Sequence, residues 1–134
     1  MNFKDIKTIG VIGSGTMGRG IAISTATAGY NTIVYDVTDE IITKAKASSE
    51  KDLQKGVEKG KLTADAKTQI IERLNFTSDF NSFASADFII EAAPESMDLK
   101  KKIFSQFFLT VFLHFRDLCK KSIFIYWKFG LKTN

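Results

Sequence analysis

The stretch VIGSGTMGRG places three glycines, with the spacing G-x-G-x-x-G, directly behind an apolar run: Gly13, Gly15 and Gly18. The run at 8–12, TIGVI, is rich in β-branched residues, which is typical of a strand buried on both faces of a parallel sheet. Small and helix-tolerant residues follow from Thr16 to Ala28, and Gly29 is placed to end a helix. The pattern therefore predicts a strand, a tight turn and a helix.

The following residues continue to alternate between strand-like and helix-like segments. Strands are expected at 8–12, 31–36, 74–79 and 87–93. Helices are expected at 16–28, at 38–60, from Thr63 to about Arg73, and from about Met97. This order, β-α-β-α-α-β-β-α with short connections, predicts an α/β fold built on a doubly wound parallel sheet.

The turn after the first strand has the chemistry to hold an anion. Its glycines permit a sharp turn, a close approach of a pyrophosphate to the backbone, and close packing of the helix on the strand. Unpaired N–H groups and the positive end of the helix dipole stabilise negative charge at the helix N-terminus. Asp36 ends the second strand, where its carboxylate can accept hydrogen bonds from an adenosine ribose. Neither Val37 nor Thr38 supplies a cation for a 2′-phosphate, so NAD is favoured over NADP.

Two alternatives fit the same residues. A glycine-rich turn of this spacing also occurs without a ligand. Asp36 also suits the N-cap of the following helix. The strand, the helix and the acidic residue in their expected places favour the dinucleotide site over both.

Charge and composition restrict the other classes of function. The formal net charge of +4 comes entirely from residues 107–134, because residues 1–106 carry equal numbers of basic and acidic side chains. That balance argues against a nucleic-acid partner. The single cysteine, Cys119, and the single histidine, His114, make neither a metal site nor a disulfide framework, which favours a cytoplasmic location. We expect no secretory signal, and the longest apolar stretch, at 103–115, is too short to cross a membrane.

Four motifs, IGVIGSGTMGRGIA, YDVTDE, EKGKLT and IIEAAPESMDLKKKIF, resemble the amino-terminal part of the 3-hydroxyacyl-CoA dehydrogenases, the 3-hydroxybutyryl-CoA subgroup in particular. The resemblance covers residues 4 to about 106 and implies an incomplete Rossmann-type NAD-binding domain at 1–106, with acyl-CoA as the substrate of intact relatives. It implies cofactor contacts at Ile12, Gly13, Ser14, Gly15, Thr16, Met17, Gly18, Asp36, Ala93, Glu95 and Lys100. It also implies that Lys59 lies near the phosphates of CoA.

Some of these implied contacts have simpler explanations. Glu95 and Lys100 equally suit the solvated start of a helix. Lys59 belongs to a lysine-rich segment, with Lys55 and Lys61 beside it, that fits the exposed face of a helix. Both interpretations remain open at the level of the sequence.

Residues 107–134 depart from the family pattern. The family's Asn-Thr-Ser-Ser loop, its Gly-x-His-Phe-Phe-Asn-Pro segment and its helical dimer domain are all missing. His114 lies in FLHF without the family's Gly, Asn and Pro, so we expect it not to be the general base, and no catalytic residue is assigned. The sequence predicts a sheet truncated after the fourth strand and the following helix, with 122–127 as a possible fifth strand.

Three hypotheses of function follow. The first is NAD-dependent oxidation of the 3-hydroxyl of a 3-hydroxyacyl-CoA, in fatty acid or butanoate metabolism, with this chain as the NAD-binding half. The second is a non-catalytic dinucleotide-binding remnant of a truncated or frameshifted gene, suggested by the change of composition near Gln106. The third is an interaction module that uses the basic, Phe-rich tail at 107–134.

Overall fold

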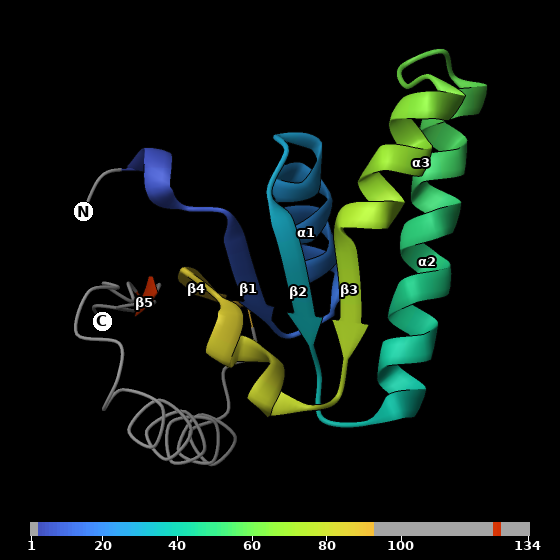
Figure 1. The fold of residues 1–134 in the computed structure, drawn as a ribbon. Helices are drawn as coiled ribbons and strands as arrows, with labels where there is room; N and C mark the ends of the chain where they lie inside the picture. The colour runs from blue at the N-terminus through green and yellow to red at the C-terminus, as the bar shows by residue number, and fades with distance from the viewer. Residues whose placement is uncertain (1–2, 93–124, 127–134) are drawn as a thin grey trace, which may run out of the picture.

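The computed structural model describes residues 3–92 and 125–126, which form a parallel sheet with helices packed against it (Figure 1). The strand order is β3-β2-β1-β4-β5, and every neighbouring pair is parallel. The strands are β1 Thr8–Ile12, β2 Asn31–Tyr35, β3 Leu74–Thr77, β4 Phe88–Glu91 and β5 Ile125–Tyr126. The predicted doubly wound α/β fold is confirmed, and the possible fifth strand is present as a short segment within 122–127.

The three α-helices of the described residues follow the predicted order, and two short 3-10 helices that were not predicted accompany them. They are the short 3-10 helix η1 Phe3–Asp5, α1 Thr16–Thr27, α2 Asp39–Glu58, α3 Ala64–Arg73 and the 3-10 helix η2 Phe80–Ser85. Three predicted strands end earlier than expected: 31–36 ends at Tyr35, 74–79 at Thr77 and 87–93 at Glu91. The helix expected from about Met97 lies outside the described residues.

Local capping explains where the second and third helices begin. The Thr38 hydroxyl accepts a hydrogen bond from the N–H of Ile41 at 3.3 Å, and the Thr63 hydroxyl accepts one from Ala66 at 3.1 Å. The first turn of α2 contains two acidic residues and that of α3 contains one, and their negative charges interact favourably with the positive end of each helix dipole. Thr38, and not Asp36, is therefore the N-cap of α2, so the N-cap alternative for Asp36 is wrong.

The two faces of the sheet bury different sets of side chains. On the face covered by α1, Ala22 packs with Ile9, Val11 and Val34. A neighbouring cluster joins α1 to α2 and α3. On the opposite face Ile12, Ile33 and Tyr35 pack against Phe80 and Phe83 of η2. Ala86 and Ile89 belong to the same cluster. Alternate residues of β1 and β2 thus point to opposite layers, as the two-residue period of a strand requires.

The 3-10 helix η2 covers the face of the sheet opposite α1, and the sequence pattern did not predict it. Its Phe80 and Phe83 rings lie edge-on to each other with centroids 5.1 Å apart, and Phe80 lies 5.1 Å from the ring of Tyr35. A Cβ on Gly10 would lie 2.7 Å from the Phe83 ring. The glycine inside β1 therefore makes room for this aromatic layer.

The order of the strands determines where a ligand can gather. The chain passes from β1 to β2 and β3 on one side, then crosses back to β4 on the other side of β1 (Figure 1). In open α/β sheets, ligands bind outside the carboxyl ends of the strands at such a reversal of order. The ends of β1, β2 and β4, at Ile12, Tyr35 and Glu91, define that edge.

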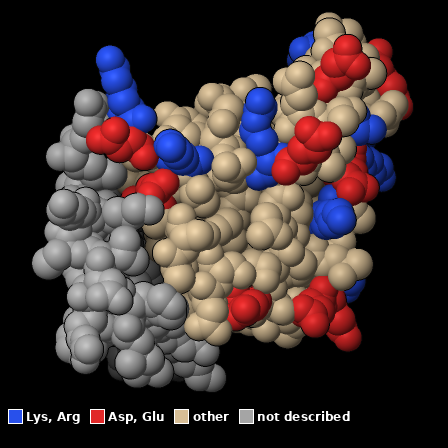
Figure 2. Space-filling model, in the orientation of Figure 1, with Lys and Arg blue, Asp and Glu red and all other residues tan. Residues whose placement is uncertain are grey.

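Three features of the described residues bear on other classes of partner. On the face drawn in Figure 2, basic and acidic side chains alternate instead of forming a patch of one sign. Within residues 3–92 and 125–126, none of the helices is long and apolar enough to span a membrane. The same residues hold no cluster of three His, Cys, Asp or Glu side chains suited to a metal ion.

Candidate functional site

The glycine turn joins β1 to α1 at the carboxyl edge of the sheet. Gly13 has a φ of 98°, a left-handed conformation that favours glycine because it has no Cβ. The N–H of Gly13 donates a hydrogen bond to the carbonyl of Tyr35 at 2.9 Å, which ties the turn to the end of β2. Helix α1 then begins at Thr16, with Gly15 as its N-cap.

Gly18 sets the distance between α1 and the turn. A Cβ on Gly18 would lie 1.8 Å from the carbonyl oxygen of Gly13 and 3.6 Å from the Cβ of Ala92. Gly15 has a different environment, because a Cβ there would meet nothing within 4 Å. The third glycine of the motif thus serves packing, whereas Gly15 leaves open space in front of the helix.

The N-cap of α1 is Gly15, which has no side chain to cap the helix. Among residues 3–92, no side-chain cap is found at this helix start, and its first turn contains no acidic residue, in contrast to the capped starts of α2 and α3. Arg19, the cation nearest to the turn in sequence, forms an ion pair with Asp52 of α2 at 3.7 Å. The N–H groups and dipole of α1 therefore present the positive potential at this point.

Asp36 follows β2 and is hydrogen-bonded to the glycine turn. Its Oδ2 atom accepts the backbone N–H of Ser14 at 2.9 Å and the Ser14 hydroxyl at 2.7 Å. Its Oδ1 atom accepts the N–H of Val37 at 2.8 Å. Asp36 and the turn thus form one unit, although they are 22 residues apart in the sequence.

Tyr35 lies in the buried layer directly before Asp36. Burial raises the pKa of the Tyr35 phenol, and the negative charges of Asp36 and Asp79 raise it further. The phenol therefore stays neutral at neutral pH, so Tyr35 adds no second negative charge beside Asp36.

The structure brings together most of the predicted cofactor residues. The segment from Ile12 to Gly18 and Asp36 lie at one edge, although the Ile12 side chain is buried in the core. Gly15, Thr16 and Met17 are exposed, and the apolar side chain of Met17 is 60% exposed. Three further predicted residues, Ala93, Glu95 and Lys100, lie outside the described residues.

Lys59 lies apart from this edge. It is the exposed C-cap residue of α2, a helix that begins beside Asp36 and runs away from the glycine turn (Figure 1). A helix of 20 residues is about 30 Å long at 1.5 Å per residue. Any ligand that contacts both Lys59 and the turn must therefore extend along the whole of α2.

Two features of the edge are not visible in the sequence pattern. The first is the pair of bonds from Ser14 to Asp36, since nothing in a G-x-G-x-x-G motif specifies the second position. The second is Glu91, which ends β4 and lies beside Ile12 of β1 in the register of the sheet. The Oε1 atom of Glu91 is buried and has no hydrogen-bond partner among the described residues. The only available signal for Glu91 was a charged residue ending an apolar strand.

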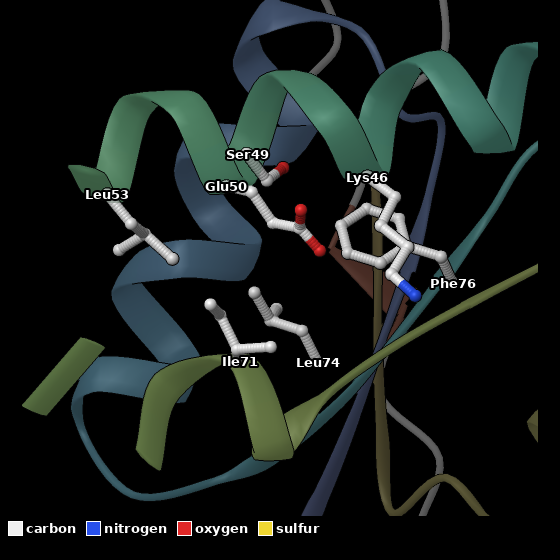
Figure 3. A pocket seen from close by; sticks show the side chains of 7 residues that line it. All are labelled: Lys46, Ser49, Glu50, Leu53, Ile71, Leu74 and Phe76. Atoms are coloured by element: carbon white, nitrogen blue, oxygen red, sulfur yellow. The ribbon is translucent and has the colours of Figure 1, made fainter. Parts of the chain in front are cut away.

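A separate groove of about 70 Å³ lies between α2, α3 and β3 (Figure 3). Its walls are largely apolar, and Lys46 and Glu50 add charged groups. The residues that line it are Lys46, Ser49, Glu50, Leu53, Ile71, Leu74 and Phe76. None of them belongs to the glycine turn, and the groove is too small for a dinucleotide.

The parallel sheet, the glycine turn, the uncapped helix and the acidic residue after β2 define a Rossmann-type dinucleotide-binding domain. Residues 8–111 match the family described as 3-hydroxyacyl-CoA dehydrogenase, NAD binding domain. The chain belongs to this family, and its cofactor is NAD.

Individual relatives agree with this assignment. The chain is 40% identical over 102 residues to 3-hydroxyadipyl-CoA dehydrogenase of Escherichia coli, covering 76% of this chain and 22% of that protein. It is 42% identical over 97 residues to a probable 3-hydroxybutyryl-CoA dehydrogenase of Deinococcus radiodurans, covering 72% of this chain and 34% of that protein. The chain thus spans between about a fifth and a third of the length of these relatives.

Solved structures give the same result. The crystal structure of 3-hydroxybutyryl-CoA dehydrogenase from Escherichia coli K12 matches with a TM-score of 0.73 and 39% identity, over 79% of this chain and 22% of that one. The crystal structure of (S)-3-hydroxybutyryl-CoA dehydrogenase from Ralstonia eutropha matches with a TM-score of 0.72 and 36% identity, over 76% of this chain and 36% of that one. The predicted family and fold are confirmed.

Proposed function

We propose that the chain binds NAD(H) with the pyrophosphate at the N-terminus of α1, over the turn from Gly13 to Gly18. The observation that carries this proposal is the combination of an uncapped helix start with open space at Gly15. Anions are stabilised there by unpaired N–H groups and the helix dipole, without a lysine in the turn. Ile12, Thr16 and Met17 flank the same edge of the sheet.

Asp36 is proposed to accept a hydrogen bond from the adenosine ribose. Its carboxylate is anchored at the carboxyl end of β2 and keeps acceptor capacity on Oδ1. A 2′-phosphate at that position would face a negative charge, so the site favours NAD over NADP. Ala93, Glu95 and Lys100 follow β4 in the sequence and are proposed as further contacts to the cofactor.

The reaction proposed for the full catalytic unit is oxidation of the 3-hydroxyl of a 3-hydroxyacyl-CoA. NAD, when bound, supplies the hydride acceptor for this chemistry. Residues 1–106 form the incomplete cofactor-binding domain in this proposal, residues 107–134 a basic, Phe-rich tail of divergent sequence, and Lys59 a contact to the phosphates of CoA. We also propose a cytoplasmic location, which the single cysteine favours.

Removal of the Asp36 carboxylate tests the proposal. We expect Asp36→Ala to weaken NAD binding about tenfold, because the charged acceptor of the ribose hydrogen bond is lost. We also expect a smaller preference for NAD over NADP, because the negative charge that repels the 2′-phosphate is lost. Calorimetric titration of both cofactors into the 134-residue chain measures the effect. Asp65→Ala, which removes an exposed carboxylate on α3, is the matched control and should bind as the unmodified chain does. Tighter binding of NADP than of NAD by the unmodified chain would contradict the assignment of Asp36.

A further inference from the structure

Ser14 holds Asp36 with both of its donors. The backbone N–H and the hydroxyl of Ser14 both donate to Oδ2, at 2.9 and 2.7 Å. Ser14 is only 3% exposed, so its hydroxyl is shielded from water as well as bonded to the carboxylate. The second position of the glycine motif is thus engaged with Asp36.

These bonds leave Asp36 little freedom to accept others. A carboxylate offers about four acceptor positions, two on each oxygen. Ser14 fills both positions on Oδ2, and the N–H of Val37 fills one on Oδ1. One position on Oδ1 remains, and the carboxylate can rotate only if both bonds to Ser14 break.

We propose that Ser14 is a positioning residue for cofactor selectivity. It fixes the orientation of the Asp36 carboxylate, so that Oδ1 accepts a hydrogen bond from one ribose hydroxyl. A 2′-phosphate is repelled by the same carboxylate, which cannot rotate to lower the repulsion. Without the hydroxyl, Asp36 keeps a single bond from Ser14 and gains freedom to rotate, which relieves the repulsion of NADP. This inference rests on the proposed NAD site and assigns part of its selectivity to a side chain that itself carries no charge.

The test compares three chains of full length: the unmodified protein, Ser14→Ala and Ser14→Cys. The ratio of the dissociation constants for NADP and NAD is measured by calorimetry. We expect both variants to lower this ratio at least about fivefold, because a charge-assisted hydrogen bond is removed from Asp36. Cysteine matches serine closely in size but is a weak donor, so it separates hydrogen bonding from the filling of space. If Ser14→Ala does not fold, as judged by circular dichroism, the ratio for Ser14→Cys decides.

Two further variants isolate the link to Asp36. Ser24→Ala removes a hydroxyl that bonds within α1 to the carbonyl of Gly20, on the exposed side, and should leave the ratio unchanged. In an Asp36→Asn background, Ser14→Ala should change the ratio little, since no charge remains to be positioned. An unaltered ratio in both Ser14 variants, with normal NAD preference in the unmodified chain, would overturn the role of Ser14 alone. Absence of NAD preference in the unmodified chain would overturn the proposed site and this inference with it.

Discussion

Gly18→Ala is expected to destabilise the domain by about 3 kcal/mol, the upper part of the usual range for an overpacked core. The added methyl group would lie 1.8 Å from the carbonyl oxygen of Gly13, which is backbone and cannot rotate aside. The helix must therefore move away from β1, and the turn that it supports must change. For a domain of this size the melting temperature should fall by at least roughly 12 °C, measured by circular dichroism. We also expect NAD binding to weaken at least tenfold.

Two other glycines of the same segment serve as controls for this result. Gly15→Ala adds its methyl group to open space, at a φ of −64° that alanine adopts readily. It should cost about 1 kcal/mol or less in stability, yet weaken NAD binding, because the methyl group stands where the pyrophosphate is proposed to approach. Gly20→Ala, in the exposed middle of α1 with open space around it, should stabilise the domain by roughly 0.5–1 kcal/mol and leave binding unchanged. Equal stability of Gly18→Ala and Gly20→Ala would contradict the packing role of Gly18.

The second large effect is the absence of turnover of 3-hydroxyacyl-CoA by the isolated 134-residue chain. Hydride leaves the substrate carbon only as the hydroxyl proton is taken, and loss of a positioned general base typically costs on the order of 10²–10⁴ in rate. The single histidine, His114, lacks the sequence context of the family's catalytic loop. The chain spans only 22% and 34% of two relatives, and where an acyl chain is not held against the cofactor, proximity effects worth up to roughly 7–11 kcal/mol are not available.

The assay for this prediction follows the reaction in the reverse direction, in which NADH is oxidised as it reduces acetoacetyl-CoA. The unmodified chain and a His114→Ala variant are compared, and both should show the background rate. Robust turnover that His114→Ala abolishes would show that the segment around His114 is a working catalytic element. It would also contradict the expectation that no catalytic residue lies in this chain.

Local signals explain why most of the fold was predictable from the sequence. The apolar run at 8–12, the glycines behind it and the capping residues Thr38 and Thr63 each act within a few neighbouring positions. They can therefore be recognised in the sequence without knowledge of the rest of the fold. The strands and helices of residues 8–91 accordingly lie close to their predicted ranges.

Long-range contacts account for what sequence reasoning missed. The helix η2 is a short 3-10 segment without a period, and it is stabilised by ring contacts of Phe80 and Phe83 with Tyr35 of a distant strand. The bonds from Ser14 to Asp36 join residues that only the register of β1 and β2 brings together. The position of Lys59 follows from the length and direction of α2 and not from its neighbours in sequence.

The backbone amide resonances of the protein report directly on whether the pyrophosphate of NAD rests on the N-terminus of α1. NAD is added to the uniformly ¹⁵N-labelled chain, and the shift of each amide is followed to saturation. We expect the largest shifts at Gly15, Thr16, Met17 and Gly18, with further shifts near Asp36. The capped first turns of α2 and α3 should respond little, apart from residues next to Asp36. If the largest shifts lie in the groove between α2, α3 and β3 and the amides from Gly15 to Gly18 do not change, the pyrophosphate does not bind at the N-terminus of α1.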